Sequence, residues 1–442
     1  MTKTELRRVA VLGGVRTPFC RSHTAYAELS NLDMLTMALT GLAERFSLGG
    51  MHIDEVVGGA VVTHAKDWNL AREAVIGSPL AQTTPGITMM QACGTSLQGA
   101  LGLAAKIATG QIECGIAMGS DTTSDAPIVF QKKFAKRLVE ASRAKSWSQR
   151  FAAFKGMSPG EIAPVPPDTR EPRTDLGMGE HCELMAKEWG ISREDQDRLA
   201  YESHKKAAAA YDDGFMDDLV IPCAGVFRDN NIRADISLEK MAELKPVFDK
   251  QGGTITAANS TPLTDGAATA LLASEEWADS KGIPVQAYLT LGRTSAVDYV
   301  EGEGLLMAPT VAVSDLLRQA GLALQDFDYY EVHEAFAAQV LATLKAWESE
   351  TYCRARLGRD APLGSIDRAK LNVEGSSIAI GHPFAATGAR ILAVLSKLLH
   401  NGNGKRGLIS VCTAGGMGVA AILEGVRAPS PAGAVLNESK QY

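Results

Sequence analysis

The sequence predicts a layered α/β fold built from two similar halves. Short apolar runs alternate with segments whose apolar residues recur at helical spacing, which is typical of strands covered by helices. The order of these segments repeats in the second half of the chain, and a stretch rich in proline and charge separates the two halves. With 442 residues the chain is also too long for one typical hydrophobic core, so we expect more than one domain.

In the first half, short apolar runs predict strands and longer amphipathic runs predict helices. The expected order is a strand at 9–13, a helix at 34–45, strands at 56–62 and 87–91, a helix at 96–108 and a strand at 114–119. The second half repeats strand and helix in a similar order, with expected elements at 288–291, 311–320, 329–332, 391–400 and 407–411. A further strand is expected at 371–373, before a glycine-rich turn. A duplicated α/β unit would bring the loops of both halves to one interface.

The middle of the chain does not alternate strand and helix. It contains several prolines between 159 and 172, many charges, and one predicted helix at 193–213. We therefore expect it to be an inserted lobe. The predicted organisation is an N-terminal half at 1–121 plus about 254–280, an inserted lobe at 122–253, a C-terminal half at 281–427 and a flexible tail at 428–442.

Composition narrows the function classes. The net charge of -7 gives no general reason to expect binding to nucleic acid. The seven cysteines are scattered, without a C-x-x-C pair or a Cys/His cluster at zinc spacing, so neither a disulfide framework nor a metal site is expected. An apolar run begins at Val9, which leaves no room for a signal or transit peptide, and no stretch suits a membrane span. We expect a cytoplasmic protein, although a mature chain whose presequence was removed would show the same features.

Three segments place a reactive side chain among small residues, which let backbone and ligand approach closely. Cys93 lies before Gly94 and a predicted helix, where the helix N-terminus would favour a thiolate nucleophile. His382 lies in Gly-His-Pro-Phe-Ala-Ala-Thr-Gly and could take the Cys93 proton. Cys412 begins Cys-Thr-Ala-Gly-Gly-Met-Gly and could transfer a proton at carbon next to a thioester carbonyl. Any one of these cysteines could instead be inert and buried, but together the three side chains suit acyl transfer through a thioester.

A fourth segment, His333-Glu334-Ala335-Phe336, follows a predicted strand and could orient a water molecule. Taken together, the four segments resemble the thiolase family, and the match extends over nearly the whole chain. Arg16-Thr17-Pro18-Phe19 and the segment that begins Asn259-Ser260-Thr261 also look like thiolase signatures. The resemblance implies a five-layer αβαβα fold of two similar halves with a loop lobe.

The resemblance also implies a mechanism. Cys93 would attack a 3-ketoacyl-CoA and hold the acyl group as a thioester, His382 would activate Cys93, and Cys412 would protonate the departing acetyl-CoA enolate. The backbone N–H groups of Cys93 and Ala414 would form one oxyanion hole, and His382 with a water held by His333 would form the other. Coenzyme A would be a co-substrate, with no permanently bound cofactor and no metal.

Two residues depart from the common family pattern. His333 stands where many members have Asn, and Ala414 stands where many have Gly. The His form is similar to the thiolases that partner a multifunctional hydratase/dehydrogenase subunit. Ala414 would contribute only its backbone N–H, so the chemistry should survive. By family position Thr261 would line the path of the CoA pantetheine. The resemblance further implies a homodimer or a dimer of dimers.

Residues 131–155 carry eight bases against one acid, interleaved with Phe134 and Leu138 at helical spacing. The bases are Lys132, Lys133, Lys136, Arg137, Arg143, Lys145, Arg150 and Lys155. This segment could be a solvated basic helix. It could also attract CoA phosphates, contact an anionic membrane surface or dock a partner subunit.

The leading hypothesis is a degradative 3-ketoacyl-CoA thiolase (acetyl-CoA C-acyltransferase) acting in fatty-acid β-oxidation. An acetyl-CoA C-acetyltransferase that forms or cleaves acetoacetyl-CoA is the alternative within the same class. From another class, the chain could be a non-catalytic CoA-binding subunit of an oxidation complex, although its Cys93, His382 and Cys412 argue against that. The acyl chain length is not legible from the sequence.

Overall fold

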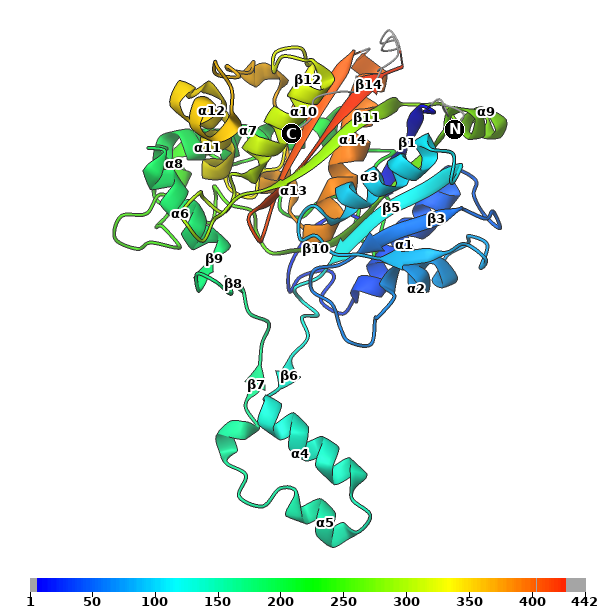
Figure 1. Cartoon of the computed structure of the whole chain (residues 1–442), viewed down its shortest axis with the longest axis vertical. Coiled ribbons are helices and arrows are strands. Elements are labelled where there is room, and N and C mark those ends of the chain that lie inside the picture. The colour runs from blue at the N-terminus through cyan, green and yellow to red at the C-terminus, as the bar shows by residue number, and fades with distance from the viewer. Residues whose placement is uncertain (1–5, 403, 427–442) are drawn as a thin grey trace, which may run out of the picture.

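The computed structural model describes residues 6–402 and 404–426. Its main sheet has ten strands in two halves (Figure 1). The N-terminal half has the order β1-β10-β5-β3-β4, with β2 paired to β10, and the C-terminal half has the order β12-β13-β14-β11. The halves join through a two-residue pairing of β1 with β11. The strands are β1 (Val9–Arg16), β2 (Cys20–Arg21), β3 (Glu55–Gly59), β4 (Gly86–Thr88), β5 (Cys114–Asp121), β10 (Thr264–Ser274), β11 (Ala287–Ala296), β12 (Tyr329–Val332), β13 (Arg406–Thr413) and β14 (Met417–Gly425).

Helices and the two sheet halves form five layers, as the sequence predicted. Helices α1 (Asn31–Arg45) and α2 (Leu70–Gly77) cover the outer face of the N-terminal half. Helices α3 (Thr95–Ala108) and α14 (Thr387–Gly402) lie in the middle layer and contact strands of both halves. The outer face of the C-terminal half is covered by α10 (Ala308–Ala320), against which α11 (Ala337–Glu348) and α12 (Glu350–Leu357) pack. Loops from the two halves therefore meet around α3 and α14.

The sequence explains why the middle layer is so tightly packed. Helix α14 is buried along nearly its whole length, including Leu392, Leu395 and Leu399, and each such side chain contributes about 1.5–3 kcal/mol by leaving water. Gly388 lies where α14 crosses α3, and a Cβ there would come 2.4 Å from the backbone nitrogen of Leu97. Only glycine allows this approach, which brings the starts of the two helices together.

The predicted elements were mostly of the right type, with two kinds of error. The long strands β10 and β14 were missed, because they are rich in alanine and glycine rather than in β-branched residues. The strand expected at 371–373 was wrong. Asn372 has a φ of 45°, and its side chain hydrogen-bonds both backbone groups of Val332 at 2.9 Å, so only Leu371 forms an isolated bridge to β12.

Residues 122–253, predicted as one lobe, contain two parts. An arm projects from the body on the short strands β6 (Val129–Phe130) and β7 (Pro164–Val165) (Figure 1). Its remaining elements are α4 (Lys132–Arg143), α5 (Trp147–Ala152) and the 3-10 turn η1 (Pro159–Glu161). The part that follows holds the strands β8 (Arg170–Glu171) and β9 (Leu176–Gly177) and the helices α6 (Met178–Glu188), α7 (Arg193–Asp212) and α8 (Leu238–Ala242).

Helices α6 and α7 pack on α11, and α7 also contacts α13 (Ser377–Ile380). The remaining short elements are α9 (Glu275–Lys281), η2 (Arg368–Lys370) and η3 (Phe384–Ala386). The expected domain boundaries stay predictions, and the tail at 428–442 lies outside the described residues. Within the described part of the chain, no helix has both the length and the apolar character needed to cross a bilayer.

Candidate active site

Cys93 lies in a strained turn between β4 and α3. The preceding residue, Ala92, has a φ of 46°, a left-handed conformation that residues with a Cβ rarely adopt. The Thr95 side chain holds this turn, because its hydroxyl donates to the Ala92 carbonyl at 2.7 Å and accepts from the Gln91 N–H at 2.8 Å. Such over-determined strain clusters at functional sites, and here it fixes the sulfur just before α3.

His382 is aimed at the Cys93 thiol. Its Nε2 lies 3.1 Å from the Cys93 Sγ, and its Nδ1 lies 2.6 Å from the Thr387 hydroxyl at the start of α14. Its backbone N–H donates to the Thr264 hydroxyl at 3.2 Å. Gly381 makes this position possible, since its φ is 111° and a Cβ would lie 2.7 Å from the Thr264 side chain. The predicted pair of thiol and imidazole is therefore a direct contact.

Burial keeps the resting pair uncharged. It raises the pKa of the Cys93 thiol to about 12, although hydrogen bonds from the backbone N–H groups of Ala414 and Cys93 itself lower it in part. Burial, aided by the Arg390 charge, lowers the pKa of His382 to about 3. The backbone N–H groups thus favour the thiolate, as expected of the helix start, but burial outweighs them in the resting site. Cys93 needs His382 as a base at the moment of attack.

This protonation state predicts how Cys93 reacts with iodoacetamide. The thiolate is a minor form at every pH below about 12, so the alkylation rate should rise roughly tenfold per pH unit between pH 7 and pH 9. The other six cysteines are 0–3% exposed, against 7% for Cys93, which limits background labelling. Mass spectrometry of the Cys93 peptide measures the rate. A plateau near neutral pH would instead indicate a stable thiolate-imidazolium pair.

The hairpin of β13 and β14 brings Cys412 and Ala414 to the same place. Cys412 is buried near the end of β13, and burial together with the neighbouring Cys93 raises its pKa well above the ordinary value. The backbone N–H of Ala414 lies close enough to the Cys93 sulfur to lower the pKa of that thiol in part. The next N–H, of Gly415, donates to the Glu171 carboxylate at 2.9 Å, which anchors the turn. The Ala side chain at 414 leaves the backbone donor available.

His333 follows β12 and is fully buried. Its Nδ1 lies 2.8 Å from the Ser377 hydroxyl, while its Nε2 has no hydrogen-bond partner among the described residues. Its ring centroid lies 4.2 Å from that of His382. Burial, His382 and Arg390 hold the pKa of His333 well below the ordinary value, so the ring is neutral. A free ring nitrogen is thus present beside His382, as water positioning would require.

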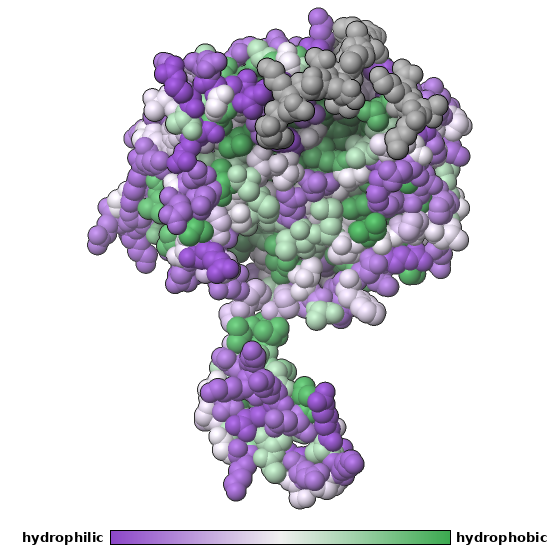
Figure 2. All heavy atoms as spheres, viewed as in Figure 1, coloured by the Kyte–Doolittle hydropathy of each residue, from purple (hydrophilic) through white to green (hydrophobic). Residues whose placement is uncertain are grey.

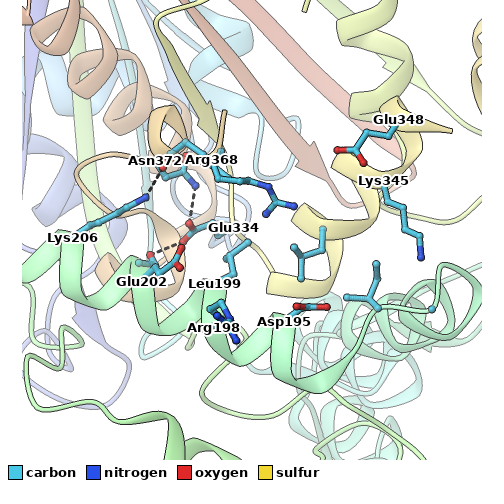
Figure 3. Close-up of a pocket in the computed structure, with 15 residues that line it drawn as sticks. Asp195, Arg198, Leu199, Glu202, Lys206, Glu334, Lys345, Glu348, Arg368 and Asn372 are labelled. Carbon is cyan, nitrogen blue, oxygen red and sulfur yellow. Dashed lines mark hydrogen bonds between the residues drawn. The ribbon is translucent and has the colours of Figure 1, made fainter. Parts of the chain in front are cut away.

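The next residue, Glu334, faces away from Cys93 and fixes the loop from behind. Its carboxylate accepts hydrogen bonds from the Ser203 hydroxyl at 2.8 Å, the Asn372 amide at 2.7 Å and the Ile378 N–H at 3.3 Å. Figure 3 shows Glu334 and Asn372 on one wall of a cavity of about 510 Å³ between α7 and α11. This cavity is not lined by Cys93, His382 or Cys412, so it is separate from the candidate active site.

The structure thus brings together Cys93, His382, His333, Cys412 and Ala414, which the sequence places in both halves of the chain. Thr261 lies beside the His333 loop, where its hydroxyl donates to the Ala335 carbonyl at 3.2 Å. Among the hydrogen bonds of the described residues, none joins Thr261 to the other predicted site residues.

Sequence reasoning missed three polar residues of the site. The hydroxyls of Thr387 and Ser377 hydrogen-bond the Nδ1 atoms of His382 and His333, respectively. Arg390, on α14, donates to the Ser377 hydroxyl. Thr387 and Arg390, one turn apart in the first part of α14, where the neighbouring residues are apolar or small, were a usable signal for two of them. Ser377 had none, because it lies in a run of small residues.

Cys93, His333 and His382 offer ligand atoms within 4.8 Å of one another, so they could approach a metal ion. A tetrahedral zinc ion holds ligand atoms about 3.5 Å apart, given bonds of about 2.0–2.3 Å. Two of these three residues, Cys93 and His382, are hydrogen-bonded to each other, an arrangement that suits proton transfer between them. The expected absence of a metal stays a prediction.

Comparison with known proteins gives a consistent assignment. Residues 9–276 match the model for the thiolase N-terminal domain, and residues 285–425 match that for the thiolase C-terminal domain. The chain is 42% identical over 430 residues to a 3-ketoacyl-CoA thiolase of Shewanella baltica, covering 96% of this chain and 98% of the relative. It is 41% identical over 423 residues to a 3-ketoacyl-CoA thiolase of Yersinia pestis, covering 94% and 97%.

Two solved structures share the architecture. The acetyl-CoA acetyltransferase of Bacillus anthracis superposes with a TM-score of 0.78 at 29% identity, and human mitochondrial 3-ketoacyl-CoA thiolase with a TM-score of 0.78 at 27% identity. Each comparison covers 96% of this chain and 100% of the other. The two matched domains, the five-layer fold and the close relatives together show that the chain belongs to the thiolase family.

Proposed function

We propose that the chain is a 3-ketoacyl-CoA thiolase, which cleaves a 3-ketoacyl-CoA with CoA to give acetyl-CoA and a shortened acyl-CoA. The observation that carries the proposal is the 3.1 Å contact between the Cys93 Sγ and the His382 Nε2, in a buried site shared with Cys412. The relatives at 41–42% identity are 3-ketoacyl-CoA thiolases, which supports the substrate class. A nucleophile beside a base, with a second proton-transfer group, suits this two-step acyl transfer.

In the first half-reaction, the Cys93 sulfur attacks the 3-keto carbon while His382 takes the thiol proton. The bond between C2 and C3 then breaks, which leaves the acyl group on sulfur and an acetyl-CoA enolate. Cys412 donates its proton to the enolate carbon, and acetyl-CoA leaves. The N–H groups of Cys93 and Ala414 would stabilise one oxyanion, and His382 with a water on His333 would stabilise another.

In the second half-reaction, CoA takes the acyl group from Cys93. The Cys412 thiolate accepts the proton of the CoA thiol, whose sulfur attacks the acyl carbon. The Cys93–acyl bond breaks, and protonated His382 returns its proton to Cys93. Both cysteines and the histidine end in their starting states, so the cycle is balanced in protons. Thr261 would contact the pantetheine arm in this scheme.

A thiolysis assay tests the proposal. Purified protein is mixed with CoA and 3-ketoacyl-CoA substrates from four to sixteen carbons, and loss of the substrate is followed. Cleavage of long chains supports the proposed function. Activity confined to acetoacetyl-CoA would instead favour the acetyl-CoA acetyltransferase alternative, which the likeness to the Bacillus anthracis enzyme supports. No activity on any chain would favour a non-catalytic CoA-binding subunit.

We also propose that the arm contacts an anionic membrane surface. Figure 2 shows apolar patches among hydrophilic residues on the arm, and α4 has no buried residue. Trp147 and Phe151 are 72% and 73% exposed, and Ile128 is 69% exposed. Exposed aromatic residues beside lysines are typical of segments that lie on lipid headgroups. Figure 1 shows the arm pointing away from the body, which argues against a role in binding CoA phosphates.

Replacing Lys132, Lys133 and Lys136 by Gln should weaken binding to phosphatidylglycerol vesicles roughly 100-fold, because each lysine near an anionic surface contributes about 1 kcal/mol. Arg137 is kept, since it holds the arm together through an ion pair with Glu161 at 2.8 Å and a bond to the Ala153 carbonyl. Cosedimentation with vesicles measures the effect.

The matched control replaces three exposed lysines of the body, Lys240, Lys245 and Lys250, by Gln. Thiolysis of soluble substrates should not change in either variant. Equal vesicle binding by both variants would reject the membrane proposal. Docking of a hydratase/dehydrogenase subunit would then be the remaining function of the arm, testable by pull-down.

We further propose that the protein is at least a homodimer formed through β4. This strand lies at the end of the sheet, so its outer backbone groups have no partner strand in the described chain. Ile87 and Met90, in and next to β4, are 45% and 62% exposed. Open edges with exposed apolar side chains pair readily with another copy. Sedimentation equilibrium of the wild type tests this, and a monomer at micromolar concentration would reject it.

A further inference from the structure

His333 has one ring nitrogen in use and one free. Its Nδ1 lies 2.8 Å from the Ser377 Oγ, and its buried Nε2 has no partner among the described residues. A neutral imidazole carries one proton, on either nitrogen. If the proton is on Nε2, the free position is a hydrogen-bond donor. If the proton is on Nδ1, the free position is an acceptor.

Arg390 decides between these two possibilities. Its Nη2 donates to the Ser377 Oγ at 2.8 Å, and a guanidinium group has no acceptor capacity. The single proton of the Ser377 hydroxyl must therefore point elsewhere. Among the hydrogen bonds of the described residues, the only acceptor that Ser377 Oγ can reach is the His333 Nδ1. Were Nδ1 protonated, the Ser377 proton would be buried without an acceptor, which is unfavourable.

We infer that Arg390 and Ser377 are positioning residues that hold His333 in the tautomer with its proton on Nε2. The chain of donors runs from Arg390 to Ser377 to His333 and ends at the free Nε2–H. The sulfur of Cys93 and ring nitrogens of His333 and His382 lie within 4.8 Å of one another, and the two imidazole centroids lie 4.2 Å apart, so the His333 ring lies beside the reacting groups. A water that it holds would stabilise a developing oxyanion, whereas the other tautomer would present a lone pair.

Arg390 is itself fixed in a buried position. It is 1% exposed, lies on the middle-layer helix α14, and has the Glu331 carboxylate 3.9 Å away. It also reaches the Ser376 Oγ at 3.3–3.4 Å. Removing one member of a buried ion pair commonly unfolds a protein, so the test is made on the serines instead. Ser376 offers a matched control, because it contacts Arg390 but not His333.

The tautomer can be measured without substrate, and so independently of the proposed thiolysis. In protein with ¹⁵N-labelled histidine rings, two-bond correlations between ring nitrogens and carbon-bound protons distinguish the tautomers. The chain has eight histidines, and the His333 signals are identified by their loss in His333→Asn. We expect Nε2–H in the wild type and in Ser376→Ala, and a mixture or Nδ1–H in Ser377→Ala. A wild-type Nδ1–H tautomer would overturn the inference even if the enzyme is a thiolase.

The kinetic arm rests on the proposed function. Ser377→Ala should lower kcat for thiolysis roughly tenfold or more, with KM within about twofold, because it misaligns an oxyanion donor rather than a binding group. Ser376→Ala should change kcat by less than about twofold, and Ser377→Thr, which keeps the hydroxyl, should recover most of the activity.

A double-mutant cycle separates positioning from structure. An Asn side chain always presents an N–H donor, so in the His333→Asn background Ser377→Ala should have little further effect on kcat. A loss of the same size in both backgrounds would mean that Ser377 only supports packing, and would overturn the inference. If Ser377→Ala does not fold, the wild-type tautomer still decides the question.

Discussion

Cys93→Ala protein should form no covalent acyl adduct with acetyl-CoA and should lose thiolysis by roughly 10⁴-fold or more. The sulfur that attacks the thioester is absent, and among the hydrogen bonds of the described residues His382 contacts the thiol of Cys93 and not that of Cys412, so the remaining thiol lacks a base. Intact-mass analysis after mixing with acetyl-CoA shows whether one acetyl group has been added. The same spectrum for the wild type gives the reference.

Cys114→Ala provides the control for this result. Burial raises the pKa of Cys114 to about 12, as it does for Cys93, but its charged neighbours are Asp54, Glu113 and Lys281 rather than an imidazole. The Cys114 thiol has the same pKa as Cys93 but no imidazole to take its proton, so it should stay unmodified. Cys114→Ala should therefore still be acetylated once, at Cys93. An acetylated Cys93→Ala protein would contradict the assignment of the nucleophile.

The fold was predictable where the sequence pattern matched the environment of each element. Helix α1 shows an apolar face at helical spacing, so its type was predicted, but it begins at Asn31 behind a Ser30–Asp33 capping box, three residues before the expected start at 34. Strand β10 could not be predicted in this way, because it consists mostly of small residues, which suit close packing between neighbouring strands and helices but lack the pattern of a strand. The segment 371–373 failed for a different reason: the Asn372 side chain replaces the backbone hydrogen bonds that a strand would make.

The candidate site was predictable in its reactive groups but not in their protonation. A Cys or His among small residues is visible in the sequence, and a family resemblance adds their roles. Burial is a property of the whole fold, so the neutral state of Cys93 and His382 could not be derived from the helix start alone. The Ser377 hydroxyl was missed for a similar reason, since only the folded chain brings it to the His333 imidazole.

Cys412 is expected to act on carbon, which requires it to be a thiol at rest. Burial and the neighbouring Cys93 raise its pKa well above the ordinary value, so its proton is present when the carbon-carbon bond breaks. The two leaving groups of the reaction differ greatly in their need for that proton. A CoA thiol leaves readily as a thiolate, whereas the enolate of acetyl-CoA is a poor leaving group unless its carbon is protonated.

Cys412→Ala should therefore separate the two chemistries. Acetylation of Cys93 by acetyl-CoA should persist within about tenfold of the wild-type rate, while cleavage of a 3-ketoacyl-CoA should fall by about 10²–10⁴-fold or more, the usual contribution of a positioned acid or base. Exchange of the acetyl-CoA methyl protons with D₂O, followed by mass spectrometry, should stop in the variant for the same reason.

Cys182→Ala is the matched control for Cys412→Ala. Cys182 on α6 is a fully buried thiol of the same size as Cys412. It is also a neighbour of Cys412, because its charged form would raise the pKa of that thiol. Its removal costs packing, about 1 kcal/mol per lost group, but removes no acid from the site. Cleavage should stay near the wild-type rate in Cys182→Ala. If both variants lose cleavage equally, packing around the β13–β14 hairpin rather than proton transfer explains the effect, and Cys412 is not the acid.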